Sequence, residues 1–190
     1  MLHGGFLTKK ELSEIGFRKI GRDVKVSRLA SIYGAENITL GDFCRIDDFN
    51  VISASGPVHI GDYVHVANQG SIIAKAELVL EEFSGVSSGV RIYTASDNFS
   101  GKAMAHPTIP EKYTNVTKAP VKVSRHAIIG ANSVVLPGVT LEEGVAVGAC
   151  SLVIESLAKW GIYGGVPAKF IKSRSKNLLK LEKEFIRSKG

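Results

Sequence analysis

An aliphatic residue recurs every six positions through most of this chain, and this period limits the possible folds more than any other feature. Rows of twenty residues starting at Ile20 align three aliphatic columns, which resume from Val123 in two rows of eighteen. The columns hold Ile20, Leu40, Ile60, Leu80, Val123 and Leu141; Val26, Ile46, Val66, Val86, Ile129 and Val147; and Ile32, Ile52, Ile72, Ile92, Val135 and Val153. An α-helix cannot give a period of six, so the repeat predicts a solenoid of parallel strands.

A second pattern accompanies the columns, because the residue four positions after a column residue is usually small. Residues two or four apart in an extended chain share a face, so both positions should point into a narrow triangular coil. The small residues are Ala30, Cys44, Gly56, Gly70, Ala76, Ser84, Ser96, Ala127, Ser133 and Ser151, while Glu36 and Asn50 break the pattern. Glycine directly follows five column residues, where we expect corners with unusual backbone angles: Gly21, Gly41, Gly61, Gly130 and Gly148.

The repeat also defines the segments of a single all-β domain over 1–190. We expect an N-terminal cap at 1–19, coils one to four at 20–96, an excursion loop at 97–120, coils five and six at 121–158, and a C-terminal turn with a basic helix at 159–190. Thr8 and Glu11 form a capping box that predicts a short first helix, ending near Gly16. A last helix is expected near Lys176 to Arg187, with one apolar face.

Composition excludes several classes of protein. The hydrophobic content of 44% is ordinary, and the chain has neither a run of about eighteen apolar residues, as a membrane span needs, nor a signal-peptide core. Cys44 and Cys150 are expected as reduced thiols, which indicates the cytoplasm. The net charge of +6 comes from residues 169–190, which contain eight Lys and Arg residues and two Glu residues. This basic patch has few aromatic residues and does not predict nucleic-acid binding.

The hexapeptide rows, the loop after the fourth coil and the ending IYGGVPAKFIK resemble the hexapeptide-repeat acyltransferases. This resemblance covers nearly the whole chain. It implies a left-handed parallel β-helix, here of about six coils, that works as a homotrimer. Five segments are similar to acyl-CoA-dependent enzymes of bacterial surface-polysaccharide (lipopolysaccharide) assembly: RIDDF (45–49), YVHVA (63–67), FSGVSSGVRIYTASDNFSG (83–101), HPTIPEKYTNVT (106–117) and HAIIGANSVVLPGV (126–139).

The same resemblance implies the substrates. Some of these enzymes N-acylate nucleotide-linked amino sugars and others O-acetylate sugars, and coenzyme A binds between neighbouring subunits. Acetyl-CoA or another short acyl-CoA is therefore the expected co-substrate, with no metal. A homotrimer also fits the physics, because a flat-sided solenoid needs a neighbour to close a ligand groove.

One corner of the expected solenoid carries polar side chains in its early rows and only glycine and alanine in its last two rows. The residues near the early part of this corner are candidates for acceptor binding: Arg45, Asp47, Asp48, His65, Asn68, Ser87 and Ser88. The late part carries residues without bulky side chains, which admit the thin pantetheine arm of coenzyme A: Gly130, Ala131, Gly148 and Ala149. The C-terminal segment adds donor-binding candidates in Trp160, Pro167, Lys169 and Lys172.

Three residues are candidates for catalysis: Asp97, His65 and His106. Relatives with a catalytic histidine carry it near the point where this chain has Asp97-Asn98. A sugar hydroxyl needs a general base to react, whereas a neutral sugar amine is already nucleophilic. We therefore favour an amine acceptor oriented by Asp97, although His65 or His106 acting as a base would restore O-acylation. His126 is expected at the surface near the donor.

Two alternatives of other classes remain open. A zinc enzyme of the carbonic-anhydrase type needs three histidines around one metal. The nearest pair, His59 and His65, is expected at opposite ends of one strand-like side, roughly 20 Å apart within one chain. A non-enzymatic scaffold would give no role to the 24-residue polar loop or to the corner that changes from polar residues to glycine and alanine.

Overall fold

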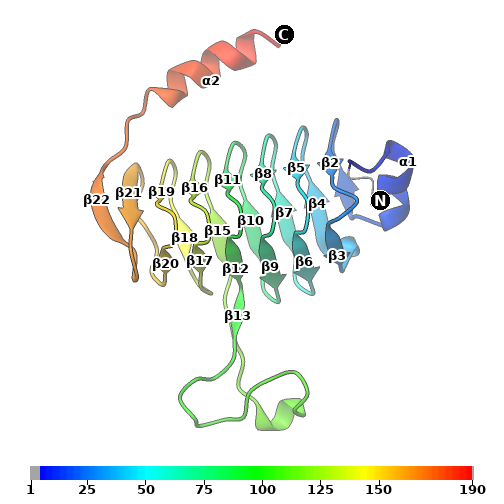
Figure 1. Cartoon of the computed structure of the whole chain (residues 1–190), viewed down its shortest axis with the longest axis vertical. Coiled ribbons are helices and arrows are strands. Elements are labelled where there is room, and N and C mark those ends of the chain that lie inside the picture. Colours follow the sequence, from blue (N-terminus) through cyan, green and yellow to red (C-terminus); the bar gives the residue numbers. More distant parts are fainter. Residues whose placement is uncertain (1–4, 190) are drawn as a thin grey trace.

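The chain forms a triangular solenoid, described over residues 5–189 by a computed structural model (Figure 1). Its first face contains β1 (Lys19–Ile20), β4 (Ile38–Leu40), β7 (Val58–Ile60), β10 (Leu78–Leu80), β15 (Val121–Val123) and β18 (Thr140–Leu141). Its second face contains β2 (Lys25–Val26), β5 (Arg45–Ile46), β8 (His65–Val66), β11 (Gly85–Val86), β16 (Ile128–Ile129), β19 (Ala146–Val147), β21 (Gly161–Gly164) and β22 (Lys169–Ser173). Its third face contains β3 (Ser31–Tyr33), β6 (Val51–Ala54), β9 (Ser71–Ala74), β12 (Arg91–Tyr93), β17 (Val134–Val135) and β20 (Leu152–Val153).

The three aliphatic columns are confirmed by the register of the strands. Leu40 pairs with Ile60 on the first face, and Ile46 pairs with Val66 on the second. Each turn of three strands is called a rung here, and the rungs are numbered from β1–β2–β3. Residues 5–189 form six complete rungs, and β21 adds part of a seventh by pairing in parallel with β19.

Column side chains fill the interior, and nearly all of them are buried. Ile20 and Ile32 on the first rung are only half-buried, because one side of that rung has no neighbouring rung. The helix α1 (Lys9–Ile15) covers this end and buries Leu12. Its capping box at Thr8 and its end at Gly16 are both confirmed.

The five corner glycines do not serve the purpose expected, and all but Gly148 instead allow a close approach between rungs. None of them has a positive φ angle. Instead, a Cβ on Gly21 would lie 2.4 Å from the carbonyl carbon of Gly41, so glycine lets adjacent rungs approach closely. Larger residues occupy the left-handed corner positions with φ of 50–61°: Asp23, Phe43, Tyr63, Phe83 and His126 after the first face, and Phe49, Gln69, Asn132 and Cys150 after the second.

The corner between the first and second faces, the first corner, carries a stack of rings. Phe43, Tyr63 and Phe83 stack with centroids 4.9 Å apart, and His126 continues the stack 5.3 Å from Phe83. The helix α2 (Leu178–Arg187) lies on this corner, with Phe185 edge-on to Tyr63. The basic C-terminal helix is therefore packed on the solenoid through its apolar face.

His126 was expected at the surface near the donor, and this expectation is wrong. Its side chain is only 8% exposed, because α2 covers it, and its Nε2 lies 3.0 Å from Glu182 Oε2. Glu182 also pairs with Arg125. Burial, followed by the nearby Arg125 charge, lowers the pKa of His126 below its ordinary value. His126 thus helps to hold α2 in place.

Two segments depart from the solenoid wall. The predicted excursion loop is confirmed: its base is the antiparallel pair β13 (Ala95–Ser96) and β14 (Thr117–Lys118), and it extends well away from the rungs (Figure 1). It carries a short 3-10 helix, η2 (Glu111–Tyr113), while η1 (Ala35–Asn37) lies between the first and second rungs. The expected C-terminal turn region contains β21 and the antiparallel β22 instead. Neither described helix is long and apolar enough to cross a membrane.

Candidate active site

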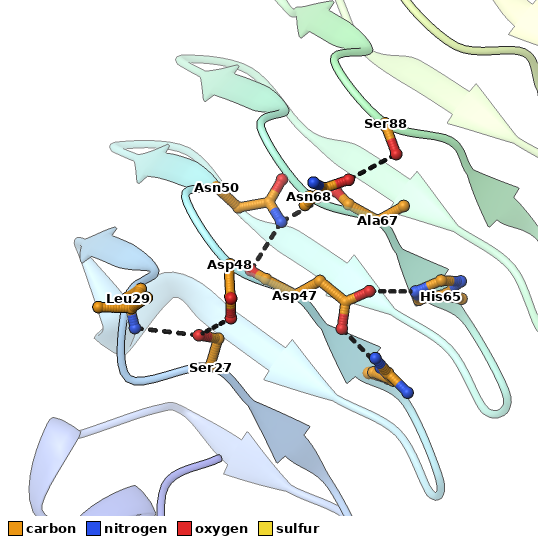
Figure 2. Close-up of polar contacts among 10 residues, drawn as sticks. Ser27, Leu29, Asp47, Asp48, Asn50, His65, Ala67, Asn68 and Ser88 are labelled. Atoms are coloured by element: carbon orange, nitrogen blue, oxygen red, sulfur yellow. Dashed lines mark hydrogen bonds and ion pairs between the residues drawn. The ribbon is translucent and has the colours of Figure 1, made fainter. Parts of the chain in front are cut away.

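The corner between the second and third faces, the second corner, carries a polar network (Figure 2). Asp47 accepts a hydrogen bond of 2.5 Å from Arg45 Nε and lies 2.8 Å from His65 Nε2. Burial raises the pKa of Asp47, but the bonds from Arg45 and His65 outweigh it, so the pKa lies below its ordinary value. Asp47 is therefore an ionised anchor that orients the two basic side chains.

Two further polar pairs extend this network across the rungs. Ser27 Oγ donates to Asp48 Oδ1, and Ser88 Oγ donates to Asn68 Oδ1, both at 2.5 Å. Ser87 is half-buried beside Ser88, and its backbone N–H donates to Ile129 on the next rung. The hydrogen bonds fix the orientations of Asp48 and Asn68 before any ligand arrives.

A cavity of about 380 Å³ lies beside this network. It brings together four of the predicted acceptor-binding residues: Arg45, Asp47, Asp48 and Asn68. Its walls also include Phe6 and Phe49, which sequence reasoning did not select. Phe49 could have been noticed as an aromatic residue at a corner position where the third to sixth rungs carry polar or small side chains.

A larger cavity of about 780 Å³ lies under the excursion loop, at the third corner, between the third and first faces. Asp97 and His106 both line it, so these two candidates lie at one cavity, formed mostly by residues of the loop itself. Lys75 and Lys118 add positive charge to its walls, and neither was selected from the sequence. The third catalytic candidate, His65, lies on the second face instead.

The candidates therefore form two groups on different corners of the same solenoid. Ser87 lies at the second corner and Asp97 at the third corner of the fourth rung, and the strand β12 separates them. At about 3.3 Å per residue, the third face holds them roughly 15–20 Å apart. One subunit cannot bring Ser87 and Asp97 to the same reacting atom.

The predicted donor residues lie mostly at the far end of the second corner. Gly130 and Gly148 follow β16 and β19 on the fifth and sixth rungs. The backbone N–H of Ala168 donates to Leu152, which brings the segment around Pro167 alongside the sixth rung. This part of the corner is open and carries small side chains.

Two of the remaining donor candidates, Trp160 and Lys172, lie away from the glycine corner. Trp160 is buried in the first corner, where a Cβ on Gly144 would lie 2.5 Å from its ring. Lys172 pairs with Ile162 on the second face, while Lys169 lies at the start of β22, 3.7 Å from Glu155. The structure does not bring Trp160 together with the glycine corner, because Trp160 occupies the left-handed first-corner position just before β21.

Within residues 5–189, no three His, Cys, Asp or Glu side chains lie close enough together to hold a metal ion. His59 and His65 lie on different faces, in β7 and β8, rather than at the two ends of one side as expected. His59 approaches Glu77 at 3.7 Å, and His65 approaches Asp47.

The chain resembles two curated proteins over most of its length, although no protein-family model matches it. It is 44% identical over 181 residues to the dTDP-4-amino-4,6-dideoxy-D-glucose acyltransferase of Escherichia coli, covering 95% of this chain and 94% of that protein. It is 31% identical over 177 residues to WbbJ of Escherichia coli K12, whose name assigns it to the O-acetyl transferases of lipopolysaccharide biosynthesis, covering 83% of this chain and 88% of that protein.

A solved structure agrees with the first of these relatives. AntD, an N-acyltransferase from Bacillus cereus crystallised with dTDP and 3-hydroxybutyryl-CoA, superposes with a TM-score of 0.94 at 43% identity and covers 97% of both chains. Other crystals of AntD variants hold dTDP-4-amino-4,6-dideoxyglucose together with coenzyme A.

Proposed function

Because this chain belongs to the hexapeptide-repeat sugar acyltransferases, whose left-handed β-helix it shares, we propose that it transfers a short acyl group from coenzyme A to the amino group of a nucleotide-linked amino sugar. The observation that carries the proposal is the 44% identity, over 95% of the chain, to a protein named for that acceptor class. AntD, which is also named an N-acyltransferase, supports the same reaction.

The proposed chemistry needs few protein groups. The neutral amine attacks the thioester carbon, a C–N bond forms, the C–S bond breaks, and the amine proton passes to the departing thiolate. Asp97 would orient the incoming ammonium and accept its first proton. Asp97 suits this role because it directly follows β13, at the base of the loop, where a short antiparallel ladder holds the backbone of the two preceding residues.

A second observation supports Asp97 together with Ser87. Crystals of AntD were obtained with single replacements of a serine and of an aspartate, ten positions apart in that chain. Ser87 and Asp97 are also ten positions apart here, on the second and third corners of the fourth rung. We assign the hydroxyl of Ser87 to the stabilisation of the thioester oxygen in the transition state.

We also propose that the active enzyme is a homotrimer, because the two corners of one subunit lie too far apart to share a substrate. A closed ring of three subunits would set the second corner of each against the third corner of its neighbour. Light scattering should then give three times the chain mass of 20.3 kDa. A monomer mass at micromolar concentration would overturn this assembly.

A shared site has a sharper test in mixed oligomers. Co-expression of the inactive Ser87→Ala and Asp97→Asn chains should restore part of the activity, because some interfaces then carry both native residues. Each variant alone serves as the control. No recovery in co-purified mixed trimers would show that Ser87 and Asp97 do not act at one site.

Acceptor class is tested by thiol release from acetyl-CoA, measured against a panel of nucleotide-linked amino sugars and simple glycosides. The amino sugars should react at least about a hundredfold faster, as expected where no base is positioned to deprotonate a sugar hydroxyl. O-acetylation is the second candidate, favoured by the likeness to WbbJ and by His106 in the loop cavity. Release with a glycoside alone would establish it.

We place the enzyme in the cytoplasm, where acyl-CoA is available. The free thiols of Cys44 and Cys150 support this placement, since oxidising compartments favour disulfides.

A further inference from the structure

Two buried serine hydroxyls meet under the last complete turn of the second corner, and the transfer proposed above does not use them. Ser133 and Ser151 are only 0% and 2% exposed. Ser151 Oγ donates a hydrogen bond to Gly148 O at 2.7 Å, and Ser133 Oγ donates to the same oxygen at 3.0 Å. One backbone carbonyl at the donor end of the corner is therefore held from the inside by two side chains.

The neighbouring rung holds the equivalent carbonyl in a simpler way. On the fifth rung the turn is closed by a backbone hydrogen bond of 3.3 Å from Ser133 N to Gly130 O. On the sixth rung Ser151 N donates to Ser133 Oγ instead, at 3.1 Å, so this turn is closed through side chains. The orientation of the Gly148 carbonyl thus depends on the two hydroxyls.

The inward carbonyl sets the direction of the next amide group. In a planar trans peptide the C=O and N–H groups point in opposite directions, so Ala149 N–H points outward while Gly148 O points into the solenoid. Ala149 is exposed, and within residues 5–189 its N–H has no hydrogen-bond partner. Gly130 on the fifth rung leaves this nitrogen uncovered, since a Cβ there would lie 2.5 Å from it. The corner therefore presents an accessible amide donor.

Without the two hydroxyls, this peptide group would be free to rotate. Gly148 has no side chain to restrict its ψ angle, so rotation of the peptide between Gly148 and Ala149 meets little steric resistance there. A rotated peptide would expose the carbonyl and direct the N–H inward. The corner would then present an acceptor where it now presents a donor.

We propose that Ser133 and Ser151 are positioning residues for the acyl donor, which hold the Ala149 N–H toward a carbonyl oxygen of bound coenzyme A. This inference rests on the proposed function, because it assumes an acyl-CoA along this corner. The sixth rung lies roughly 10 Å from Ser87 along the solenoid axis. Because Ser87 is assigned to the thioester oxygen, the oxygen bound at Ala149 belongs to an amide of the pantetheine arm.

Ser151 also connects this peptide to the chain beyond the sixth rung. Its Oγ accepts a hydrogen bond of 3.2 Å from Gly165 N, and Gly165 O accepts one of 3.0 Å from Leu152 N. The hydroxyl that orients the Ala149 amide therefore also holds the turn that leads to Pro167, a predicted donor-binding residue. Loss of the Ser151 hydroxyl should weaken donor binding at least as much as loss of the Ser133 hydroxyl.

The proposal is tested on the full-length protein by calorimetry with coenzyme A and by steady-state kinetics with acetyl-CoA. Ser151→Ala and Ser133→Ala should each raise the Kd of coenzyme A and the KM of acetyl-CoA by a similar factor, about three- to tenfold, as expected for one hydrogen bond. The kcat of both variants should stay within about twofold of the native value, because a contact with the arm is made equally in the ground state and the transition state.

Two further variants separate hydrogen bonding from packing. Ser84→Ala is the matched control, since Ser84 occupies the equivalent inward position under the first corner, and its buried hydroxyl has no partner among residues 5–189. It should bind coenzyme A like the native protein. Ser151→Cys fills nearly the same space but donates weakly, so it should lose as much affinity as Ser151→Ala. It replaces that variant should Ser151→Ala fail to fold.

A spectroscopic measurement reports on the amide itself. In protein isotopically labelled at the alanine amides, the Ala149 amide proton should move downfield when coenzyme A saturates the native chain, because a new hydrogen bond forms there. The same proton should not move downfield in Ser151→Ala. A purely structural role of the serine would leave this shift intact in the variant.

Different results overturn different proposals. Native protein that binds coenzyme A, with both alanine variants binding it equally well, would refute the role of the serines alone. A fall in kcat at unchanged KM, or native affinity in Ser151→Cys, would also refute it, because the hydroxyls would then not act through an amide contact with the arm. Native protein that neither binds coenzyme A nor releases thiol with any acceptor would instead overturn the proposed function.

Discussion

Two glycines of the second corner should respond in opposite ways to the same added methyl group. A Cβ on Gly130 would lie 2.5 Å from the backbone nitrogen of Ala149 and 2.7 Å from the carbonyl carbon of Gly148. A Cβ on Gly148 would meet Tyr163 O at 3.4 Å and Gly164 Cα at 3.8 Å. Gly130→Ala therefore forces a clash with the backbone of the next rung, whereas Gly148→Ala makes near-ordinary contacts.

The size of the difference follows from those distances. The sixth rung cannot move away easily, because Gly130 N donates to Val147 O at 2.8 Å and Cys150 N donates to Ala131 O at 2.8 Å. Overpacking against such a rigid neighbour costs about 1–3 kcal/mol or more. Where alanine fits, replacing glycine instead stabilises by about 0.4–1 kcal/mol through the unfolded chain. For a chain of this length, each kcal/mol shifts Tm by about 2–4 °C.

Differential scanning calorimetry at one fixed protein concentration measures this contrast. We expect Tm to fall by roughly 4–10 °C in Gly130→Ala and to stay within about 3 °C of the native value in Gly148→Ala. Equal shifts would refute the argument from close approach between rungs. Gly148→Leu then tests the donor groove, because its longer side chain should raise the KM for acetyl-CoA while leaving Tm nearly unchanged. Unfolding of that variant would remove the support for the groove.

Asp97→Asn should lower kcat at least about a hundredfold, and His106→Ala less than about tenfold, because Asp97 directly follows the ladder at the base of the loop, whereas the His106 imidazole is exposed within the loop. Steady-state kinetics that gave the reverse order would identify His106 as the base and a hydroxyl as the acceptor. Native protein should expose one thiol per chain to a disulfide reagent, since Cys150 is exposed whereas burial raises the pKa of Cys44 to about 12; two reactive thiols without denaturant would contradict the buried position. Glu182→Ala should destabilise the packing of α2 by about 1–3 kcal/mol, because it leaves two basic partners without their carboxylate; hydrogen exchange over 178–187 that stayed at the native rate would show that the helix does not depend on this pair.

Much of the fold could be predicted because one periodic constraint acts on every rung. A column such as Ile46, Val66 and Val86 must face inward together, and the six-residue spacing has no other regular explanation. The loop was predictable for the converse reason, since the period stops at Asp97 and resumes near Val121. Periodicity reports which side chains point inward, and it carries that information reliably.

Features that depend on contact between distant segments could not be read in the same way. His126 looked like an exposed turn residue because nothing in its neighbourhood shows that α2 returns to cover it. The glycines were assigned to unusual backbone angles because a sequence does not display the distance between rungs. Trp160 looked like part of the donor site because it lies near Pro167 in the chain, although the two fall on different corners.

In the candidate site too, features set by the repeat could be predicted, and features set by contacts between distant segments could not. Arg45, Asp47, Asp48 and Asn68 were predicted as one group because each lies within two residues of the same column, and the structure places them around one cavity. Phe6 was missed because it reaches that cavity from outside the repeat, through the segment before α1. The gap between Ser87 and Asp97 was also hidden, since separation around a coil appears only when the corners are laid out in space.

The closing of the two solenoid ends governs how the molecule behaves in a crowded solution. A stack of parallel rungs ends in unsatisfied N–H and C=O groups that could template another copy, as in fibrils. Here β22 runs antiparallel to β21 and presents Lys169 and Lys172 along the outer edge, while α1 and the segment at Phe6 cover the first rung. Reversed strand direction and repelling charge make the two ends poor matches for each other, so a protein built like a segment of fibre remains finite in length.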